Sequence, residues 1–464
     1  MANIPQDEGR GNFGSLIGFV MAGAGSAIGL GNIWRFPYVT GESGGAAFLV
    51  IYLAFVLLIG VPVIYAELAM GRASQRNPVG AFAALGPKEG GNPWVAVGGL
   101  GVITGFAILA FYSVVAGWTL GYVGMAFGGT FAGGVTAEQS GAIFGGFVAN
   151  PVWAVALTAS FLVLTALVVR GGVQKGIERA TSILMPVFLI LLVLLAGRAL
   201  TLPGAMAGVE FLFLPDFSKI TPTVVLNALG QALFSLSLGM GAMITYGSYL
   251  DRTQSMPFAG ATVALFDTGI AILAGLIIFP ALYAAGVKPE DGGAGLVFVV
   301  MPTIFEAMPL GNVFAIAFYV LLATAALTST VSLLEVIVSY LVDEQGLGRE
   351  AAVWGTTAAC LALALPSALS VGAVDQLSSL PGLGMSFLDL QDLIWGNYSL
   401  SIGALLICIF AGWVWGVQPA VDEMTRSGHD LPASAVWGFL VRYVCPVAIA
   451  GLLVYITYNL VTGA

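Results

Sequence analysis

Long apolar segments, separated by short polar breaks, run through almost the whole chain and limit its fold more than any other feature. A helix needs about 20 mostly apolar residues to cross the roughly 30 Å hydrocarbon core of a bilayer. Only 8% of the 464 residues are charged, whereas soluble domains carry about 25%. We therefore expect an all-α, polytopic membrane protein. The eleven expected transmembrane helices lie near residues 15–40, 44–71, 93–128, 152–170, 178–198, 223–250, 257–286, 311–342, 351–371, 387–417 and 436–460.

The basic residues predict the orientation of the chain, because loops rich in Lys and Arg stay on the cytoplasmic side. With the N-terminus inside, eleven Lys and Arg residues fall on the cytoplasmic side, whereas Arg198, Lys219 and Lys288 fall outside. An odd number of helices then places the C-terminus outside. Residues 1–14 are polar, lack the pattern of a secretory signal and are expected to form a cytoplasmic N-terminus. The short termini and the lack of a large external loop favour a prokaryotic inner membrane.

The composition also argues against several function classes. The formal net charge of −9 disfavours a nucleic-acid partner, because proteins neutralise phosphates with Lys and Arg. The three Cys residues and the single His are scattered along the chain, so the sequence shows no spacing typical of a metal site or a disulfide framework. It shows no set of residues typical of a catalytic site either. We therefore expect a protein that is not an enzyme.

Two of the expected helices contain residues that should interrupt them. In the first, Gly23, Gly25, Gly29 and Gly31 cluster midway, and each Gly costs up to about 1 kcal/mol in a helix relative to Ala. The sixth expected helix carries a similar Ser- and Gly-rich stretch at 235–241. Gly-interrupted segments at corresponding positions of two five-helix sets indicate a transporter with its binding site between inverted repeats. The same glycines could instead serve as hinges or permit close packing, and their spacing does not decide between these roles.

Polar residues lie deep within the apolar segments. Asn32, Ser235, Asp267, Thr328 and Ser329 all fall inside expected helices, where an ionisable residue is rare and usually functional. Hydroxyl and carbonyl oxygens with few formal charges suit a monovalent cation better than Ca²⁺, which takes several carboxylates. A single Ser or Thr can instead bond back to the carbonyl four residues earlier. The grouping of these residues, rather than any one of them, indicates a cation site.

Three longer motifs identify a family resemblance. Residues 25–72 contain GLGNIWRFPY, residues 230–249 read GQALFSLSLGMGAMITYGSY, and residues 325–344 read AALTSTVSLLEVIVSYLVDE. Through these motifs the chain resembles the neurotransmitter:sodium symporter family, especially its bacterial amino-acid transporters, over nearly its whole length. The resemblance implies the leucine-transporter fold, with two inverted five-helix repeats whose first helices, the first and sixth of the chain, are broken. The repeats would span residues 15–198 and 223–417, and residues 436–460 would form an accessory helix.

The same resemblance implies sodium-coupled symport of an amino acid by alternating access, with two Na⁺ ions. The carboxylate of the substrate would complete the ligand shell of one ion, whereas the other ion would have no ionised ligand. The first sodium site would comprise the Ala27 carbonyl with Asn32, Ser235 and Asp267. The second sodium site would comprise the carbonyls of Gly25, Ile28 and Ala325 with the hydroxyls of Thr328 and Ser329.

The resemblance also bears on chloride. Chloride-dependent members of the family hold an anion near the first sodium site, at positions that match Tyr52, Gln231, Ser235 and Ala271 here. Ala271 lacks the hydroxyl found at that position, and Asp267 would supply a negative charge within the site itself. The resemblance therefore implies transport that needs no chloride. Asp267 would then exchange a proton when the site empties.

The implied substrate is an α-amino acid. Amine-transporting relatives carry an Asp where this chain has Gly29, so the carboxylate of the substrate itself would face the ion. Ile108, Met240 and Leu333 match side-chain pocket positions and are apolar, which favours a broad preference for hydrophobic or aromatic amino acids. The implied substrate-binding residues are Ser26, Ala27, Leu30, Gly31, Ile108, Tyr112, Phe234, Ser235, Ser237, Met240, Ser329 and Leu333.

Two gates follow from the same resemblance. Arg35 would pair with Asp392 on the outer side, and Asp389, one turn earlier, is the alternative partner. Arg10 would pair with Asp343 on the inner side. Exposed ion pairs contribute about 0–1 kcal/mol, which suits contacts that must open in each cycle.

Two other functions remain open on the same fold. A sodium-selective channel could line a pore with the same oxygen ligands, and a sensor could bind an amino acid without moving it. A pocket at the membrane midplane between two gates favours the symporter. Concentrative uptake under an imposed sodium gradient distinguishes the three.

Overall fold

The computed structural model describes residues 11–89, 91–131, 135–289, 295–306, 309–431 and 433–462. Within these ranges the regular structure is helical, without a β-strand. Nine helices in the described chain are long and apolar enough to cross a bilayer. They are Ala46–Ser74 (containing α3, Ala46–Phe55, and α4, Val61–Ser74), Val95–Phe127 (α6), Pro151–Arg170 (α8), Val173–Leu200 (containing α9, Arg179–Leu200), Met256–Ala284 (α13), Gly311–Asp343 (α15), Arg349–Leu369 (α16), Phe387–Val414 (containing α18, Phe387–Gln391, and α19, Leu400–Ile409) and Ser434–Thr462 (containing α21, Ser434–Phe439, and α22, Cys445–Thr462).

The first expected helix is broken. It consists of α1 (Leu16–Ala27) and a second half, Gly31–Glu42, that ends in α2 (Phe36–Glu42), and the halves are bent by 51°. At the break, Ile28 takes an extended conformation with φ −77° and ψ 110°. Asn32 stabilises the break, because its Oδ1 accepts a hydrogen bond from the Gly29 amide at 3.0 Å. The predicted interruption of this helix is confirmed.

The sixth expected helix is broken as well. It consists of α11 (Pro222–Ser235) and α12 (Ala242–Ser248), joined by residues 236–241. Ser237, Gly239 and Gly241 have φ values of 54°, 85° and 79°, in the left-handed region that favours glycine. Glu67 supports this segment from α4, since its Oε1 accepts a hydrogen bond from the Gly239 amide at 2.7 Å. The glycines thus allow a change of chain direction that a continuous helix does not permit.

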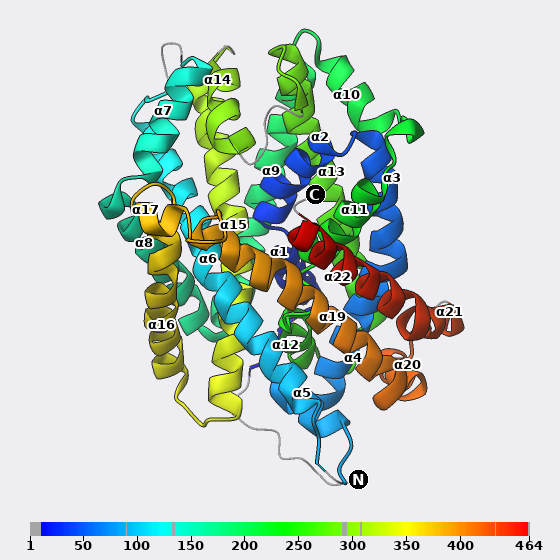
Figure 1. The fold of residues 1–464 in the computed structure, drawn as a ribbon. Helices are drawn as coiled ribbons and strands as arrows, with labels where there is room; N and C mark the ends of the chain where they lie inside the picture. The colour runs from blue at the N-terminus through cyan, green and yellow to red at the C-terminus, as the bar shows by residue number, and fades with distance from the viewer. Residues whose placement is uncertain are drawn as a thin grey trace.

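The broken first helix runs through the middle of the bundle (Figure 1). α1 contacts α9, α13 and α15, and α6 packs along α15. Shorter helices gather at the two ends: α7, α10 and α14 at the upper end of Figure 1, and α5 and α20 toward the lower end. These short helices were not predicted, because a search for membrane-length apolar segments does not detect them. They are α5 (Pro78–Leu85), α7 (Ala137–Val148), α10 (Ala205–Phe213), α14 (Met301–Glu306), α17 (Asp375–Ser378) and α20 (Val417–Met424).

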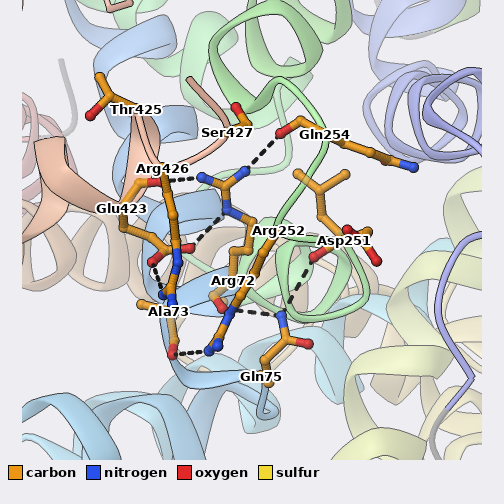
Figure 2. Close-up of polar contacts among 12 residues, drawn as sticks. Arg72, Ala73, Gln75, Asp251, Arg252, Gln254, Glu423, Thr425, Arg426 and Ser427 are labelled. Carbon is orange, nitrogen blue, oxygen red and sulfur yellow. Dashed lines mark hydrogen bonds and ion pairs between the residues drawn. The ribbon is translucent and has the colours of Figure 1, made fainter. Parts of the chain in front are cut away.

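A buried ion pair joins three segments near the end of α4 (Figure 2). The Arg72 side chain is fully buried, and its Nε lies 2.9 Å from Glu423 Oε1 of α20. Arg72 also donates to the carbonyls of Glu423 and Gln254, and Arg426 Nη1 donates to Glu423 Oε2 at 3.1 Å. A buried charge is tolerated when it is paired and hydrogen-bonded. This arrangement therefore fixes α20 and the segment before α13 to the end of α4.

Candidate functional site

A cavity lies between the two broken helices, α6, α15 and the start of α19. It encloses about 400 Å³ of space between atoms, including its open mouth. Ten of the twelve residues predicted to bind substrate line it. They are Ser26, Ala27, Gly31, Ile108, Tyr112, Phe234, Ser237, Met240, Ser329 and Leu333.

The cavity lining differs from the predicted set by a few residues. Gly29, Ser332 and Leu400 also line the cavity, whereas Leu30 and Ser235 lie outside the lining. The Leu30 amide instead donates to the Tyr112 hydroxyl oxygen at 2.8 Å. The Ser235 hydroxyl instead contacts Asp267, at 2.9 and 3.0 Å from its two carboxylate oxygens. Leu30 thus contacts a residue of the lining, and Ser235 contacts a residue predicted for the first sodium site.

Polar groups converge at one part of the cavity. Tyr112 accepts a hydrogen bond from the Leu30 amide, so that bond leaves its O–H free to donate. The Ser26 hydroxyl is buried and has no hydrogen-bond partner among the described residues. A buried polar group without a partner is costly, and a ligand in the cavity would satisfy it. A side chain at Gly29 would fill this region, because its Cβ would lie 2.5 Å from Ser329 Oγ and 2.7 Å from the Tyr112 oxygen.

Three of the four residues predicted for the first sodium site, Asn32, Ser235 and Asp267, form one buried cluster. Asn32 Nδ2 donates to Asp267 Oδ1 at 2.7 Å and lies 3.1 Å from Ser235 Oγ. Tyr52 adds its hydroxyl, 3.4 Å from Asp267 Oδ2. Asp267 and Asn32 are fully buried, and Ala27 lines the adjacent cavity. The cluster therefore concentrates oxygen atoms and one carboxyl group beside the place where a ligand would lie.

Oxygen atoms of the second predicted sodium site also meet. Thr328 Oγ1 lies 3.0 Å from the Ala325 carbonyl and 3.4 Å from the Ile28 carbonyl. Ser329 Oγ lies 3.2 Å from the same Ile28 carbonyl. Gly25 allows this approach of α1 to α15, because a Cβ there would already lie 3.2 Å from Thr328 Cβ. Loss of helical hydrogen bonding at the end of α1 leaves such carbonyls available.

Two of the positions that the resemblance relates to a chloride site meet in the first cluster, because the Tyr52 hydroxyl lies 3.5 Å from Ser235 Oγ. Gln231 Nε2 donates to the Gly31 carbonyl at 2.9 Å, and Gln231 Oε1 is buried without a partner in the described chain. Ala271 is fully buried. Because alanine offers no hydrogen-bonding side chain, this region has fewer donors for an anion than a serine would give.

Arg35 and Asp392, which were predicted to form the outer gate, are connected through a third side chain. Arg35 Nη2 donates to Asn397 Oδ1 at 3.3 Å, and Asn397 Nδ2 donates to Asp392 Oδ2 at 3.2 Å. The Arg35 guanidinium also lies 4.4 Å from the centre of the Phe234 ring, which lines the cavity. Asp389 instead caps α18, where its carboxylate accepts from the Ser386 hydroxyl at 2.7 Å. The sequence did not indicate Asn397, which carries no charge.

The structure describes one of the two residues predicted to form the inner gate. Arg10 lies outside the described residues. Asp343 accepts a hydrogen bond from Asn77 Nδ2 at 3.1 Å. Close to Arg10 in the sequence, Phe13 packs edge-on against Phe19 and Tyr246, with ring centres 5.4 and 5.7 Å apart. The start of the described chain is thus anchored by aromatic contacts.

Comparisons with known proteins agree on one family. The model of the sodium:neurotransmitter symporter family matches residues 10–136 and 147–462. The sodium-dependent transporter YhdH of Bacillus subtilis is 41% identical over 94% of this chain and 95% of its own length. A sodium-dependent transporter of Haemophilus influenzae is 33% identical over 95% of this chain and 96% of its own length. Among solved structures, MhsT in complex with L-phenylalanine superposes with a TM-score of 0.88, at 44% identity, over 96% of this chain and 99% of MhsT.

These matches confirm the predicted all-α, multi-pass membrane protein with the leucine-transporter fold. They also confirm that the protein is a transporter and not an enzyme. Both relatives are sodium-dependent transporters, and this chain matches nearly their full length. The chain therefore belongs to the sodium:neurotransmitter symporter family.

Proposed function

We propose that this transporter couples the inward movement of a hydrophobic α-amino acid to the entry of two Na⁺ ions. One observation carries the proposal: a single cavity lies between two helix breaks and adjoins two clusters of oxygen atoms. Occupation of the cavity and of the oxygen clusters would then be interdependent, because they share residues. Ser329, for example, lines the cavity and belongs to the second cluster.

The polar part of the cavity suits the α-carboxylate and α-amine of an amino acid. The Tyr112 O–H would donate to the carboxylate, and the unpartnered Ser26 hydroxyl would bond to the same end of the substrate. Gly29 carries no carboxylate that could compete for an amine. The carboxylate of the substrate would therefore lie beside Ala27 and complete the first sodium site.

The remaining lining selects an apolar side chain. Ile108, Phe234, Met240 and Leu333 all line the cavity, and a flexible methionine side chain adapts to ligands of different shape. MhsT, the structural relative, binds L-phenylalanine. These observations support a broad preference for hydrophobic and aromatic amino acids.

Two monovalent cations fit the two oxygen clusters. The first contains Asp267 as its one carboxyl group, and the second contains hydroxyl and carbonyl oxygens from Ile28, Ala325, Thr328 and Ser329. Divalent Ca²⁺ takes six to eight oxygen ligands, commonly with several carboxylates. A site without a formal charge holds Na⁺ weakly, which suits release when the inner side opens.

Asp267 makes added chloride unnecessary in this proposal. Its carboxylate would balance the charge of the first Na⁺ from within the site, whereas relatives that use chloride place an anion nearby. Ala271 supports the same conclusion, because it lacks a hydroxyl at the position of an anion ligand. Asp267 would take up a proton when the site empties. The empty transporter would carry this proton back to the outer side.

Alternating access would use the two gates. On the outer side, Arg35 contacts Asn397 and the Phe234 ring, and Asn397 contacts Asp392; these contacts would close the cavity. On the inner side, Asp343 would pair with Arg10. We place the N-terminus in the cytoplasm, the C-terminus outside and the protein in a prokaryotic inner membrane, following the distribution of Lys and Arg.

Uptake into sealed vesicles tests the proposal. Purified full-length protein in liposomes, under an inward Na⁺ gradient, should accumulate labelled L-phenylalanine above its external concentration. Replacing external Na⁺ by K⁺ should abolish accumulation, and replacing chloride by gluconate should not. Dissipation of the gradient without accumulation would indicate a channel. Sodium-dependent binding without uptake would indicate a sensor.

A further inference from the structure

Leu400 lines the cavity although its helix is not one of those that build the rest of the site. It is the first residue of α19 and is only 2% exposed. The other lining residues come from the two broken helices, α6 and α15. Leu400 therefore supplies a wall that is separate from the helix breaks and the sodium clusters.

Direct backbone contact places Leu400 beside Met240. A Cβ on Gly239 would lie 2.1 Å from the Leu400 carbonyl oxygen, and a Cβ on Gly403 would lie 2.1 Å from the Gly239 carbonyl oxygen. No side chain fits between these two segments, so α19 packs against the sixth-helix break through backbone atoms. Since Met240 follows Gly239 in the chain, Leu400 and Met240 lie at the same end of the cavity.

Hydrogen bonds on both sides hold this contact in place. Ser399 Oγ lies 2.5 Å from Thr104 Oγ1, which connects the start of α19 to α6. The Gly239 amide donates to Glu67 Oε1 at 2.7 Å, which connects the break to α4. A side chain whose backbone is supported in this way forms a fixed boundary, as a selective binding site requires.

This end of the cavity is apolar. Met240, Leu333 and Leu400 are 5%, 3% and 2% exposed. Ser332 also lines the cavity, but its hydroxyl donates to the Ser329 carbonyl at 2.8 Å, so its own helix already provides a hydrogen-bond partner. A ligand would therefore meet hydrocarbon surface at this end.

We infer that Leu400 is a specificity-determining residue that limits how large a side chain the transporter accepts. The inference rests on the proposed function, which places the substrate carboxylate near Tyr112 and Ala27. The amino-acid side chain would then extend toward Met240, Leu333 and Leu400. A close-fitting apolar wall discriminates ligands that differ by one methylene by about 10- to 200-fold.

Competition binding to the purified full-length transporter at saturating Na⁺ tests this role. The measured quantity is the ratio of the affinity for L-tryptophan to the affinity for L-leucine. Leu400→Ala should raise this ratio by about tenfold or more, and Leu400→Phe should lower it by a similar factor. Leu405→Ala is the matched control, because Leu405 is a partly buried residue of α19 that does not belong to the cavity lining. It should keep the wild-type ratio.

The outcomes separate this inference from the proposed function. If wild type binds amino acids only with Na⁺ and both Leu400 variants keep its ratio, Leu400 is a packing residue and the inference fails alone. If wild type binds no amino acid in Na⁺, the proposed function fails and the inference falls with it. Should Leu400→Ala not fold, Leu400→Val provides the same contrast with Leu400→Phe through a smaller loss of volume.

Discussion

Asn32 and Asp267 are joined by a hydrogen bond of 2.7 Å from Nδ2 to Oδ1. Asn32 belongs to the second half of the broken first helix, and Asp267 lies midway along α13. The same Asn32 side chain accepts the Gly29 amide at the break. One amide group therefore links the shape of the break to the only carboxyl group of the first oxygen cluster. A substitution of Asp267 should therefore alter the conformation of the break and of the adjoining cavity.

Replacement of Asp267 by Asn should make transport depend on chloride or abolish sodium binding. Asn is close to Asp in size but removes the negative charge that would balance the first Na⁺. Uptake of L-phenylalanine should be measured with chloride and with gluconate as the external anion. Asp422→Asn, an exposed carboxylate of α20, is the control and should behave as wild type. Chloride-free uptake at the wild-type rate in Asp267→Asn would contradict the role given to this residue.

Replacement of Thr328 by Val should weaken sodium binding while largely preserving the shape of α15. The variant removes the Thr328 hydroxyl from the buried ion site, and losing one such partner costs about 1–3 kcal/mol of binding free energy. The sodium concentration for half-maximal uptake should therefore rise by about 5- to 150-fold. Thr357→Val in α16 removes a buried hydroxyl that donates to the Val353 carbonyl and should leave the sodium dependence unchanged. An unchanged sodium dependence in Thr328→Val would remove Thr328 from the proposed second site.

Much of the site was predictable because its residues are unusual for a membrane helix. Glycines grouped midway along two apolar segments predicted both breaks, and Asp267 was conspicuous as a carboxyl group at membrane depth. The residue types alone left open whether the glycines serve binding or packing. The structure shows two spatial requirements: Gly29 leaves room beside Tyr112 and Ser329, and Gly25 lets α1 approach α15.

Residues that act through distant contacts were not predictable. Leu400 is an ordinary apolar residue in an apolar helix, and only the approach of Gly239 to α19 brings it to the cavity. Asn397 joins Arg35 to Asp392 without any charge that would signal a gate. Arg72 and its buried partner, Glu423, lie 351 residues apart in the chain. Such pairings depend on tertiary packing rather than on local pattern.

Replacement of Gly29 by Ala should abolish substrate binding. The added Cβ would lie 2.5 Å from Ser329 Oγ and 2.7 Å from the Tyr112 oxygen, far inside normal contact distance, so it would displace the groups that face the substrate. Sodium-dependent binding of L-phenylalanine should fall below detection. Gly355→Ala in α16 is the matched control, because its Cβ would meet nothing within 4 Å and Ala favours a helix by about 1 kcal/mol over Gly. Wild-type affinity in Gly29→Ala would show that this region does not hold the ligand.

Removal of one partner from the Arg72–Glu423 pair should destabilise the protein strongly. Glu423→Ala leaves the fully buried Arg72 guanidinium without its carboxylate, and an uncompensated buried charge of this kind costs about 3–5 kcal/mol. The thermal unfolding temperature of the purified protein in detergent should therefore fall clearly.

The double variant Arg72→Met with Glu423→Leu should recover much of the loss, since apolar replacements of a buried pair are often nearly neutral. Arg426→Ala, which removes a half-exposed arginine from the same carboxylate, should change stability by no more than about 1 kcal/mol. Equal losses in Glu423→Ala and Arg426→Ala would mean that burial of Arg72 is not what makes this contact important.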